Sequence, residues 1–261
     1  MTRRSALALL SAGISLPCHA APSSRDPALK PLRSCRQLLR VETAGWKATS
    51  GVFTLWTREK SGAPWQPDGP PIPVLVGRAG MRWGRGLHRV PAGGVLKREG
   101  DLCTPAGIFN LDTAFGSMAA QQAGVSRWPW QQMTPSHAGV DDARSRFYNR
   151  VVDASCVKKD WTSAENMMPK NGAYRCGLIV RHNWDRQPGA GSCIFLHIRT
   201  SRPTVGCTSM SAASLLRVLR WLDTSKNPLL IQLPKAEWQI HGPAWGVPVS
   251  ANTARKPKTA R

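Results

Sequence analysis

Glycine and proline are spread so widely along this chain that few stretches are long enough for a helix. The sequence has 23 Gly and 21 Pro among 261 residues, and both residue types interrupt helices and mark turns. Between them lie short apolar segments with β-branched and aromatic side chains, at residues 52–57, 72–76, 174–182, 193–198 and 229–233. Such segments are typical of strands. The sequence therefore predicts a mainly β fold with few, short helices.

Residues 211–222 are the exception and predict a helix near the C-terminal end. They contain neither glycine nor proline, and their leucines recur at helical spacing with arginines on the opposite side. Ser211 is a residue type that caps helix N-termini. In contrast, residues 114–146 are polar with little periodicity and predict a long loop, in which Trp128 and Trp130 either form a substrate wall or pin the loop to the core.

The N-terminus has the pattern of an export signal. Arg3 and Arg4 precede a short apolar run, and Ala20 suits a cleavage site. We expect a signal peptide at 1–20, a flexible leader at 21–48, one catalytic domain at 49–240 and a basic tail at 241–261. No later run is apolar and long enough for a transmembrane helix, so we expect an exported protein of the periplasm or cell envelope of a bacterium.

The charge balance indicates anionic surroundings. The formal net charge is +21, and removing two arginines with the signal leaves 21 − 2 = +19. Such an excess favours a cell-wall polymer, lipid head groups or nucleic acid, and export argues against nucleic acid. The alternative is that the charge mainly keeps the protein soluble.

Six of the seven cysteines remain after cleavage at Ala20. An oxidising compartment would favour pairing some of them. No CxxC spacing occurs, and the histidines are not clustered with the cysteines in a zinc-ligand pattern. We therefore predict no metal site and no cofactor.

A histidine and a cysteine near the end of the chain are the candidates for catalysis. His197 lies in an apolar segment, and Cys207 follows ten positions later after a polar loop. That loop can double back, and an imidazole beside a thiol makes cysteine a nucleophile. Gly206 permits a tight turn that aims the Cys207 N–H at a developing oxyanion. The alternative reading is a core histidine and a cysteine that is paired or simply buried.

Two further features bear on this site. A helix beginning after Met210 would lower the pKa of the Cys207 thiol through its N-terminal dipole. His182 follows the strand that precedes His197, so it is a second candidate for the base. Only His197 lies next to the Cys207 loop, which favours it.

Two sequence blocks carry a resemblance to a known family. Residues 99–109 read EGDLCTPAGIF, similar to a GD-x-x-TP-x-G-x-F element, and residues 197–207 read HIRTSRPTVGC, similar to a His…[Ser/Thr]-x-Gly-Cys signature. In this order, over roughly residues 50–233, the chain resembles the L,D-transpeptidase catalytic-domain family with the YkuD-type fold.

The resemblance implies a curved β-sandwich and a peptidoglycan tetrapeptide stem as substrate. It implies Cys207 as the acylated nucleophile, His197 as its general base, and an oxyanion hole at Gly206 and the Cys207 backbone. Thr204 and Arg199 are predicted to shape the site, and Asp101, Thr104 and Gly107 to build the turn beside it.

The chain also departs from the family pattern. Ser209 stands where the family commonly has arginine, and Val205 where it often has histidine. The acyl acceptor therefore stays open between an amine, which gives transpeptidation, and water, which gives a peptidase or amidase. A third hypothesis is a basic wall-binding module in which Cys207 is inert.

Overall fold

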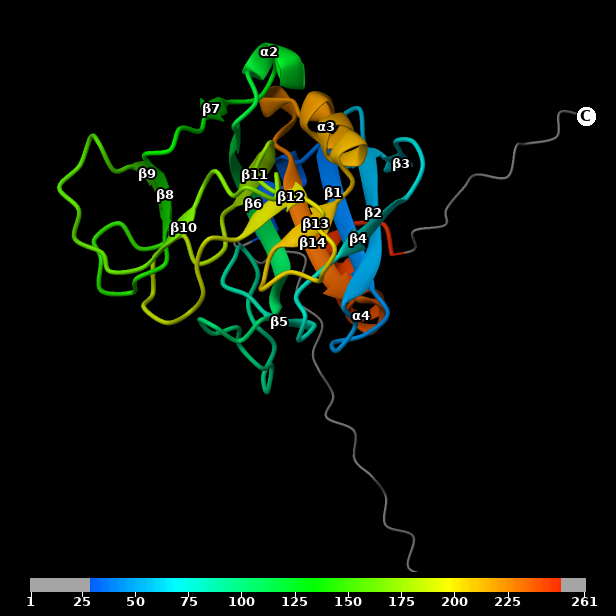
Figure 1. The fold of residues 1–261 in the computed structure, drawn as a ribbon. Coiled ribbons are helices and arrows are strands. Elements are labelled where there is room, and N and C mark those ends of the chain that lie inside the picture. The colour runs from blue at the N-terminus through cyan, green and yellow to red at the C-terminus, as the bar shows by residue number, and fades with distance from the viewer. Residues whose placement is uncertain (1–28, 250–261) are drawn as a thin grey trace, which may run out of the picture.

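The computed structural model describes residues 29–249 and centres on a sheet that closes on itself (Figure 1). Neighbouring strands around the ring are β1 (Gln37–Thr43), β14 (Leu229–Pro234), β6 (Thr104–Gly116), β11 (Gly177–Val180), β12 (Phe195–Ile198), β13 (Thr208–Met210), β4 (Ile72–Leu75) and β2 (Ser50–Thr57). β2 then pairs with β1 and completes the ring. The predicted mainly β fold with few helices is confirmed, and the sheet is barrel-like.

Short elements extend this ring. β3 (Gln66–Pro67) pairs with β2, while β5 (Met81–Trp83) and β7 (Trp130–Gln132) pair with β6. A separate small sheet has β8 (His137–Val140) between β9 (Arg150–Asp153) and β10 (Ala164–Asn166). It forms the lobe beside the barrel in Figure 1. The region 114–146, predicted as a loop, therefore contains the end of β6 and all of β7 and β8.

Five helical segments accompany the strands. They are α1 (Lys30–Ser34), α2 (Ala120–Ala123), α3 (Ala212–Trp221), the 3-10 turn η2 (Thr224–Lys226) and α4 (Lys235–Trp245) among residues 29–249. The helix predicted at 211–222 is confirmed as α3, and the Ser211 side chain caps it by accepting the Ser214 N–H at 3.2 Å. None of the helices described here has the length and apolar content to cross a bilayer.

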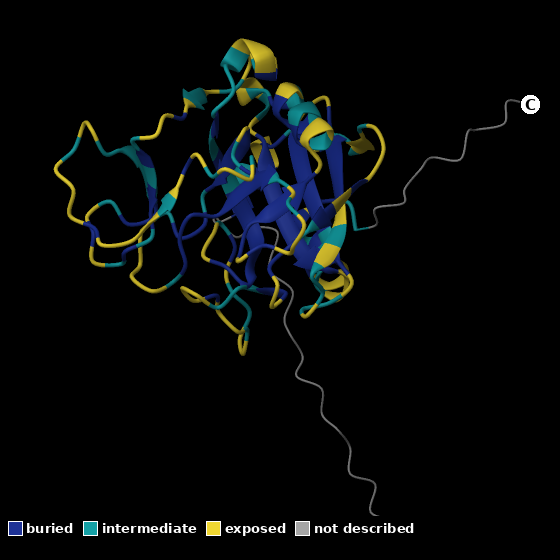
Figure 2. Cartoon of the chain, in the orientation of Figure 1, coloured by how far each residue is buried: buried dark blue, intermediate teal, exposed yellow. Residues whose placement is uncertain are grey.

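The buried apolar residues form three clusters, and the barrel strands are the most buried part of the molecule (Figure 2). The largest cluster joins the barrel interior to α3 through Leu215 and Leu219. The second lies under α4 and includes Trp238. The third contains Phe195 and Cys207 and lies against the small sheet through Met167 of the loop after β10. α3, α4 and the small sheet therefore each pack against a different one of the three clusters.

The predicted segment boundaries need correction. β1 lies within 21–48, the range predicted as a flexible leader, yet it pairs with both β14 and β2 and is almost entirely buried. α4 crosses the predicted domain end at 240 and buries Trp245. Arg40 of β1 donates to the carbonyls of Pro248 and Val249 at 3.1 and 2.7 Å, which ties that segment to the barrel. The predicted signal peptide and residues 250–261 of the predicted tail lie outside the described residues.

The Thr-Pro-Ala-Gly segment, expected as a turn, is instead the start of β6. Thr104 pairs with Met81 of β5, and the Pro105 carbonyl accepts the Gln232 side-chain amide at 2.7 Å. Gly107 has φ 133°, and a Cβ there would collide with the His88 ring. These turn-forming residue types therefore lie within a long strand and do not end it.

Candidate active site

Cys207 lies just before β13, on the outer face of the barrel, and is 4% exposed. Its sulfur accepts the Phe195 N–H at 3.3 Å, and its thiol donates to the Cys193 carbonyl at 3.5 Å. Because β12 and β13 are parallel, with Leu196 opposite Thr208, Cys207 flanks Phe195. Strand pairing therefore fixes the thiol beside β12.

Two threonines, one from each sequence block, hold the peptide of Cys207. The hydroxyls of Thr104 and Thr204 both donate to the Cys207 carbonyl, at 3.0 and 2.5 Å. Thr104 also accepts the Gly77 N–H at 2.8 Å, and Thr204 accepts the Gly206 N–H at 3.2 Å. The Gly206 N–H is thus engaged, which leaves the Cys207 N–H as the candidate oxyanion donor. The two blocks, far apart in sequence, meet at this one carbonyl.

His197 has the protonation state that a general base needs. Its Nδ1–H donates to the Ile198 carbonyl at 2.8 Å, which leaves Nε2 as the acceptor nitrogen. Burial lowers the pKa of His197, although the bond to Ile198 opposes this. The imidazole is therefore neutral near pH 7. It lies two residues along β12 from Phe195, on the same face as Cys207. No hydrogen bond joins its ring to the thiol within residues 29–249.

The thiol itself differs from the sequence-based expectation. Burial raises the pKa of Cys207, the nearby Glu165 raises it further, and the Phe195 N–H and Lys97 lower it. The expected helix dipole acts from too far away, because β13 separates Cys207 from the start of α3 at Ala212. The resting site thus holds a neutral thiol beside a neutral imidazole.

A buried ion pair between Lys97 and Asp101 lies next to the Gly206–Cys207 turn. Lys97 Nζ donates to Asp101 at 2.8 Å, and both side chains are buried. Burial alone would raise the pKa of Asp101, but hydrogen bonds from Lys97 and from the backbone N–H groups of Arg98 and Cys103 lower it. A Cβ on Gly206 would lie 3.5 Å from Lys97 Nζ. Asp101 was predicted to help build the turn beside the site, whereas Lys97 lies outside the family-like block and was not predicted.

A tyrosine and a glutamate complete the polar surroundings, and neither was predicted. The Tyr174 hydroxyl donates to Glu165 at 2.5 Å, and its ring packs edge-on against His197 with centroids 5.4 Å apart. Burial raises the pKa of Glu165 to about 7, although the Tyr174 hydroxyl opposes this. Glu165 comes from β10, a strand in a stretch without apolar periodicity, so no sequence pattern pointed to it.

The other predicted candidates have different surroundings. His182 is fully buried, and both ring nitrogens have backbone partners: Nδ1 accepts the Arg85 N–H at 3.2 Å, and Nε2–H donates to the Ala190 carbonyl at 3.0 Å. Burial lowers the pKa of His182 to about 3. Arg199 follows β12 with an exposed side chain that bonds to no other described residue. Both ring nitrogens of His182 are therefore occupied, which argues against His182 as the base for Cys207. The predicted site-shaping role of Arg199 stays a prediction.

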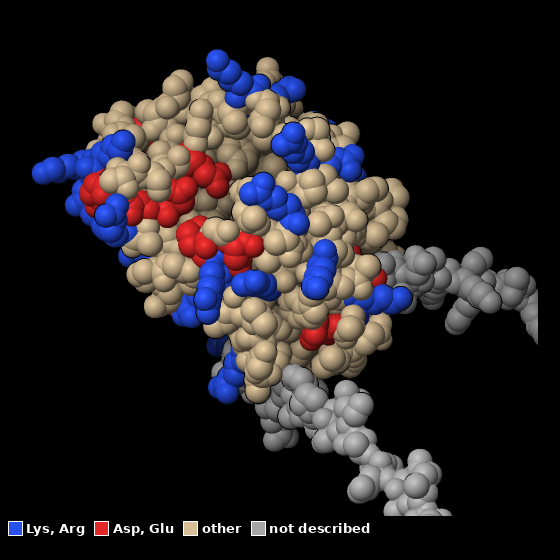
Figure 3. Space-filling view, turned by 60° about the horizontal axis from the view of Figure 1, so that its bottom comes forward, with Lys and Arg blue, Asp and Glu red and all other residues tan. Residues whose placement is uncertain are grey.

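The remaining expectations concern cysteines, tryptophans and charge. Cys35, Cys103, Cys156, Cys176, Cys193 and Cys207 are all free thiols. No group of three or more possible metal ligands occurs among residues 29–249. Trp128 pins its loop by donating to the Asp112 carbonyl at 2.7 Å. Lys and Arg side chains are scattered over the face in Figure 3 and are interrupted by patches of Asp and Glu.

Comparison with known proteins identified no relative of this chain. Scans against protein-family models, curated proteins and solved structures found no match to this chain.

Proposed function

We propose that this chain is an exported cysteine acyltransferase that remodels or cross-links peptidoglycan peptide stems, resembling L,D-transpeptidases in chemistry and in the curved-sandwich type of its sheet. One observation carries the proposal. Hydroxyls from the two family-like blocks, Thr104 and Thr204, converge on the carbonyl of Cys207. A buried carbonyl that accepts two hydrogen bonds holds the backbone of Cys207, the proposed nucleophile, in one position. Such preorganisation favours catalysis.

His197 begins the reaction. Its Nε2 takes the proton from Cys207 Sγ as sulfur attacks the amide carbonyl of the stem, and the carbonyl oxygen becomes an oxyanion. The Cys207 N–H stabilises that charge. The tetrahedral intermediate collapses when the carbon–nitrogen bond breaks, and the His197 imidazolium returns the proton to the leaving amine. The product is a thioester on Cys207.

The second half-reaction regenerates the enzyme. An acceptor amine attacks the thioester, loses a proton to His197 and expels Cys207 sulfur, which regains that proton. Water in place of the amine gives hydrolysis by the same steps. Because both resting groups are neutral, the proton moves during the attack, unlike in a site that holds a preformed thiolate.

The burial of Cys207 favours a second candidate function. A thiol that is 4% exposed, with a raised pKa and no hydrogen bond to His197, fits an inert residue in a basic wall-binding module. In that case the excess of Lys and Arg, 36 against 15 Asp and Glu, would carry binding to the anionic wall.

Intact-mass analysis with purified muropeptides separates these candidates. We expect a stem-peptide adduct on Cys207 of the wild type, no adduct on Cys207→Ser, and an unchanged adduct on Cys156→Ser, since Cys156 is an exposed free thiol. Released products then distinguish an amine acceptor from water. An adduct on another residue, or none with an intact fold, would reject the acyltransferase and leave the binding module.

A further inference from the structure

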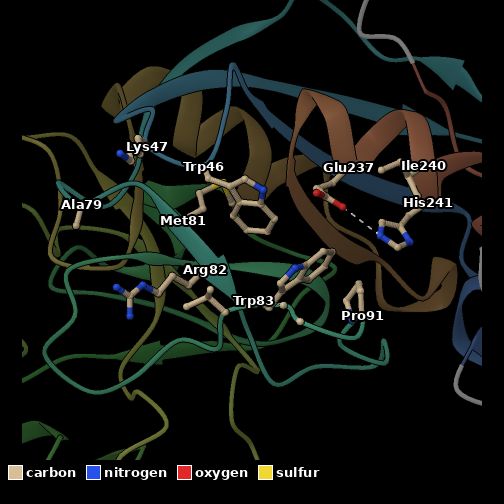
Figure 4. A pocket seen from close by; sticks show the side chains of 13 residues that line it. Trp46, Lys47, Ala79, Met81, Arg82, Trp83, Pro91, Glu237, Ile240 and His241 are labelled. Atoms are coloured by element: carbon tan, nitrogen blue, oxygen red, sulfur yellow. Dashed lines mark ion pairs between the residues drawn. The ribbon is translucent and has the colours of Figure 1, made fainter. Parts of the chain in front are cut away.

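A pocket of about 430 Å³ lies on the barrel surface away from the third core cluster. Its walls are the turn between β1 and β2, strand β5, the loop at residues 91–95 and one side of α4 (Figure 4). This volume lies within the range of small-molecule sites. The pocket shares no lining residue with the surroundings of Cys207, so the chemistry proposed above does not use it.

Two tryptophans form the apolar part of the pocket. The rings of Trp46 and Trp83 lie next to each other, with centroids 5.3 Å apart and planes tilted by 60° (Figure 4). Trp83 is held by the edge-on ring of His241 at 5.5 Å. Neither indole N–H donates to any residue between 29 and 249, so each is available to a ligand. Rigid aromatic walls with spare donors suit a ligand that has both apolar and hydrogen-bonding surfaces.

Charges of both signs surround these rings. Lys47 and Arg82 lie on one side, and Glu237 lies on the other, where its carboxylate is 3.2 Å from Nε2 of His241 (Figure 4). The His241 side chain is 7% exposed, and its Nδ1 has no hydrogen-bond partner within the described chain. A purely apolar ligand would desolvate these groups without compensation. An anionic ligand would meet the Glu237 carboxylate.

We propose that this pocket binds a neutral pyranose unit of a polysaccharide. A pyranose ring has an apolar C–H face, whose positive hydrogens fit the negative face of an indole ring. Its rim carries hydroxyls, which accept from Lys47, Arg82 and the indole N–H groups and donate to Glu237. This combination of ring faces, donors and one acceptor is what the pocket offers.

The pocket is coupled to the backbone of Cys207 through β5 and β6. Met81, which lines the pocket, pairs with Thr104, whose hydroxyl holds the Cys207 carbonyl. Arg82 Nη1 lies 3.9 Å from Asp101, the partner of Lys97. The pocket and the backbone of Cys207 are therefore linked through one pair of neighbouring strands. The inference does not depend on the proposed acyl transfer, because sugar binding requires only the pocket.

Calorimetric titration with a soluble N-acetylglucosamine tetramer tests this inference. The probe has no peptide, so a failed acyl transfer and a failed sugar site give different results. We expect binding to the wild type and equally to Cys207→Ala. Trp46→Ala should weaken it about tenfold or more, because a large aromatic contact is lost. Trp65→Ala is the matched control, a half-buried tryptophan outside the pocket.

A second pair of measurements excludes an anion site. Sugar binding should change little with salt, because the ligand is neutral, and Glu237→Gln should weaken it by removing the carboxylate acceptor. Benzoate serves as an anionic aromatic competitor. Tighter binding of benzoate than of the tetramer, strengthened by low salt and by Glu237→Gln, would overturn the inference. Sugar affinity unaffected by Trp46→Ala, or no binding by a folded wild type, would do the same.

Discussion

The balance of forces on one sulfur atom decides how Cys207 can react. Lys97 and the Phe195 N–H favour the thiolate, whereas burial and the Glu165 carboxylate favour the thiol, and burial is the larger effect. Burial lowers the pKa of His197, which favours the neutral imidazole. A neutral pair costs less desolvation than an ion pair in an apolar cluster. Substrate binding then has to bring the imidazole to the thiol.

Alkylation as a function of pH tests this balance. We expect iodoacetamide to label Cys207 of the free protein with a midpoint above the usual thiol value of 9.0, because burial raises its pKa. The measured quantity is the pH at which the labelling rate is half-maximal. Poor access of the reagent lowers the rate at every pH but does not shift this midpoint. Peptide mass spectrometry follows Cys207 and the exposed Cys156 in the same sample. A Cys207 midpoint well below 9.0 would indicate a preformed thiolate and restore the sequence-based expectation.

The two tyrosines of the chain provide a matched test of the Glu165 cluster. Both donate to a glutamate at 2.5 Å, Tyr174 to Glu165 and Tyr148 to Glu99, but only Tyr174 contacts His197. Tyr174→Phe keeps the ring and removes a hydrogen bond to a carboxylate. Because the Tyr174 ring that packs against His197 is then held less firmly, we expect roughly a tenfold loss of acylation rate, which corresponds to about 1.4 kcal/mol.

The pH profile shows whether that loss is chemical or structural. Without the Tyr174 hydroxyl the pKa of Glu165 should rise further, so the carboxylate that raises the pKa of Cys207 should form only at higher pH. The pH profile of acylation should change accordingly. Tyr148→Phe should leave both the rate and the profile close to wild type. Equal losses in the two variants would assign Tyr174 a packing role only.

At the scale of elements, the fold was predictable where local patterns are strong. α3 shows a leucine stripe with a serine cap, and the β11–β12 pair shows two apolar runs around a polar loop. β1 was missed because Arg40 interrupts its apolar run. The burial of Arg40 is stabilised by the Glu42 carboxylate, by the Pro248 and Val249 carbonyls and by the Trp238 ring, most of them distant in sequence. α4 was missed because it contains Gly242 and Pro243 and has no apolar stripe.

At the candidate site, too, only the residues marked by a local pattern were predictable. His197 and Cys207 are close in sequence, and a glycine and an apolar strand mark them. Lys97, Glu165 and Tyr174 reach the site only through the closure of the barrel and the packing of the small sheet, which no local pattern encodes. The direction of the thiol pKa depends on burial, and burial follows from the complete fold.

The packing of α4 against the barrel can be tested at Trp238. Trp238 is fully buried, donates to the Val41 carbonyl at 3.0 Å and lies under the Arg40 guanidinium at 4.1 Å. Trp238→Ala should therefore lower the free energy of unfolding by about 3–5 kcal/mol. The exposed neighbour Gln239 is the control, and Gln239→Ala should change it by less than about 0.5 kcal/mol. Urea unfolding measures both, and similar small effects would mean that α4 is not part of the cooperative unit.

In the molecule as a whole, the candidate site at Cys207 and the proposed sugar pocket lie at separate places on one barrel. α4 covers the wall near the proposed sugar pocket, and the small sheet covers the wall near Cys207. β6 belongs to both regions, since its first residues pair with β5 and bond to the Cys207 carbonyl. A strand shared by the two regions fixes their separation, which is what the proposed substrate, with peptides extending from a sugar chain, would need.

Buried thiols distributed over this barrel should make its stability fall in alkali. Burial raises the pKa of Cys35 to about 12 and that of Cys176 to about 11, and also raises that of Cys193. A thiol whose folded pKa exceeds its unfolded value contributes fully below about pH 9.0 and loses its contribution as pH rises. Each such thiol adds a slope of at most about 1.4 kcal/mol per pH unit.

The free energy of urea unfolding between pH 7 and 10.5 tests this linkage, with reductant present to keep the thiols free. We expect a plateau up to about pH 9.0 and a decline above it. Cys176→Ala should be less stable than the wild type at pH 7 because the substitution opens a cavity. Above pH 9.0 its free energy of unfolding should fall less steeply, because one titrating thiol is missing. Substituting the exposed Cys156 by Ala should leave the slope unchanged, because that thiol is not desolvated by folding. A wild-type free energy that stays level to pH 10.5 would mean that these thiols open to solvent, and the neutral resting state assigned to Cys207 would lose its physical basis.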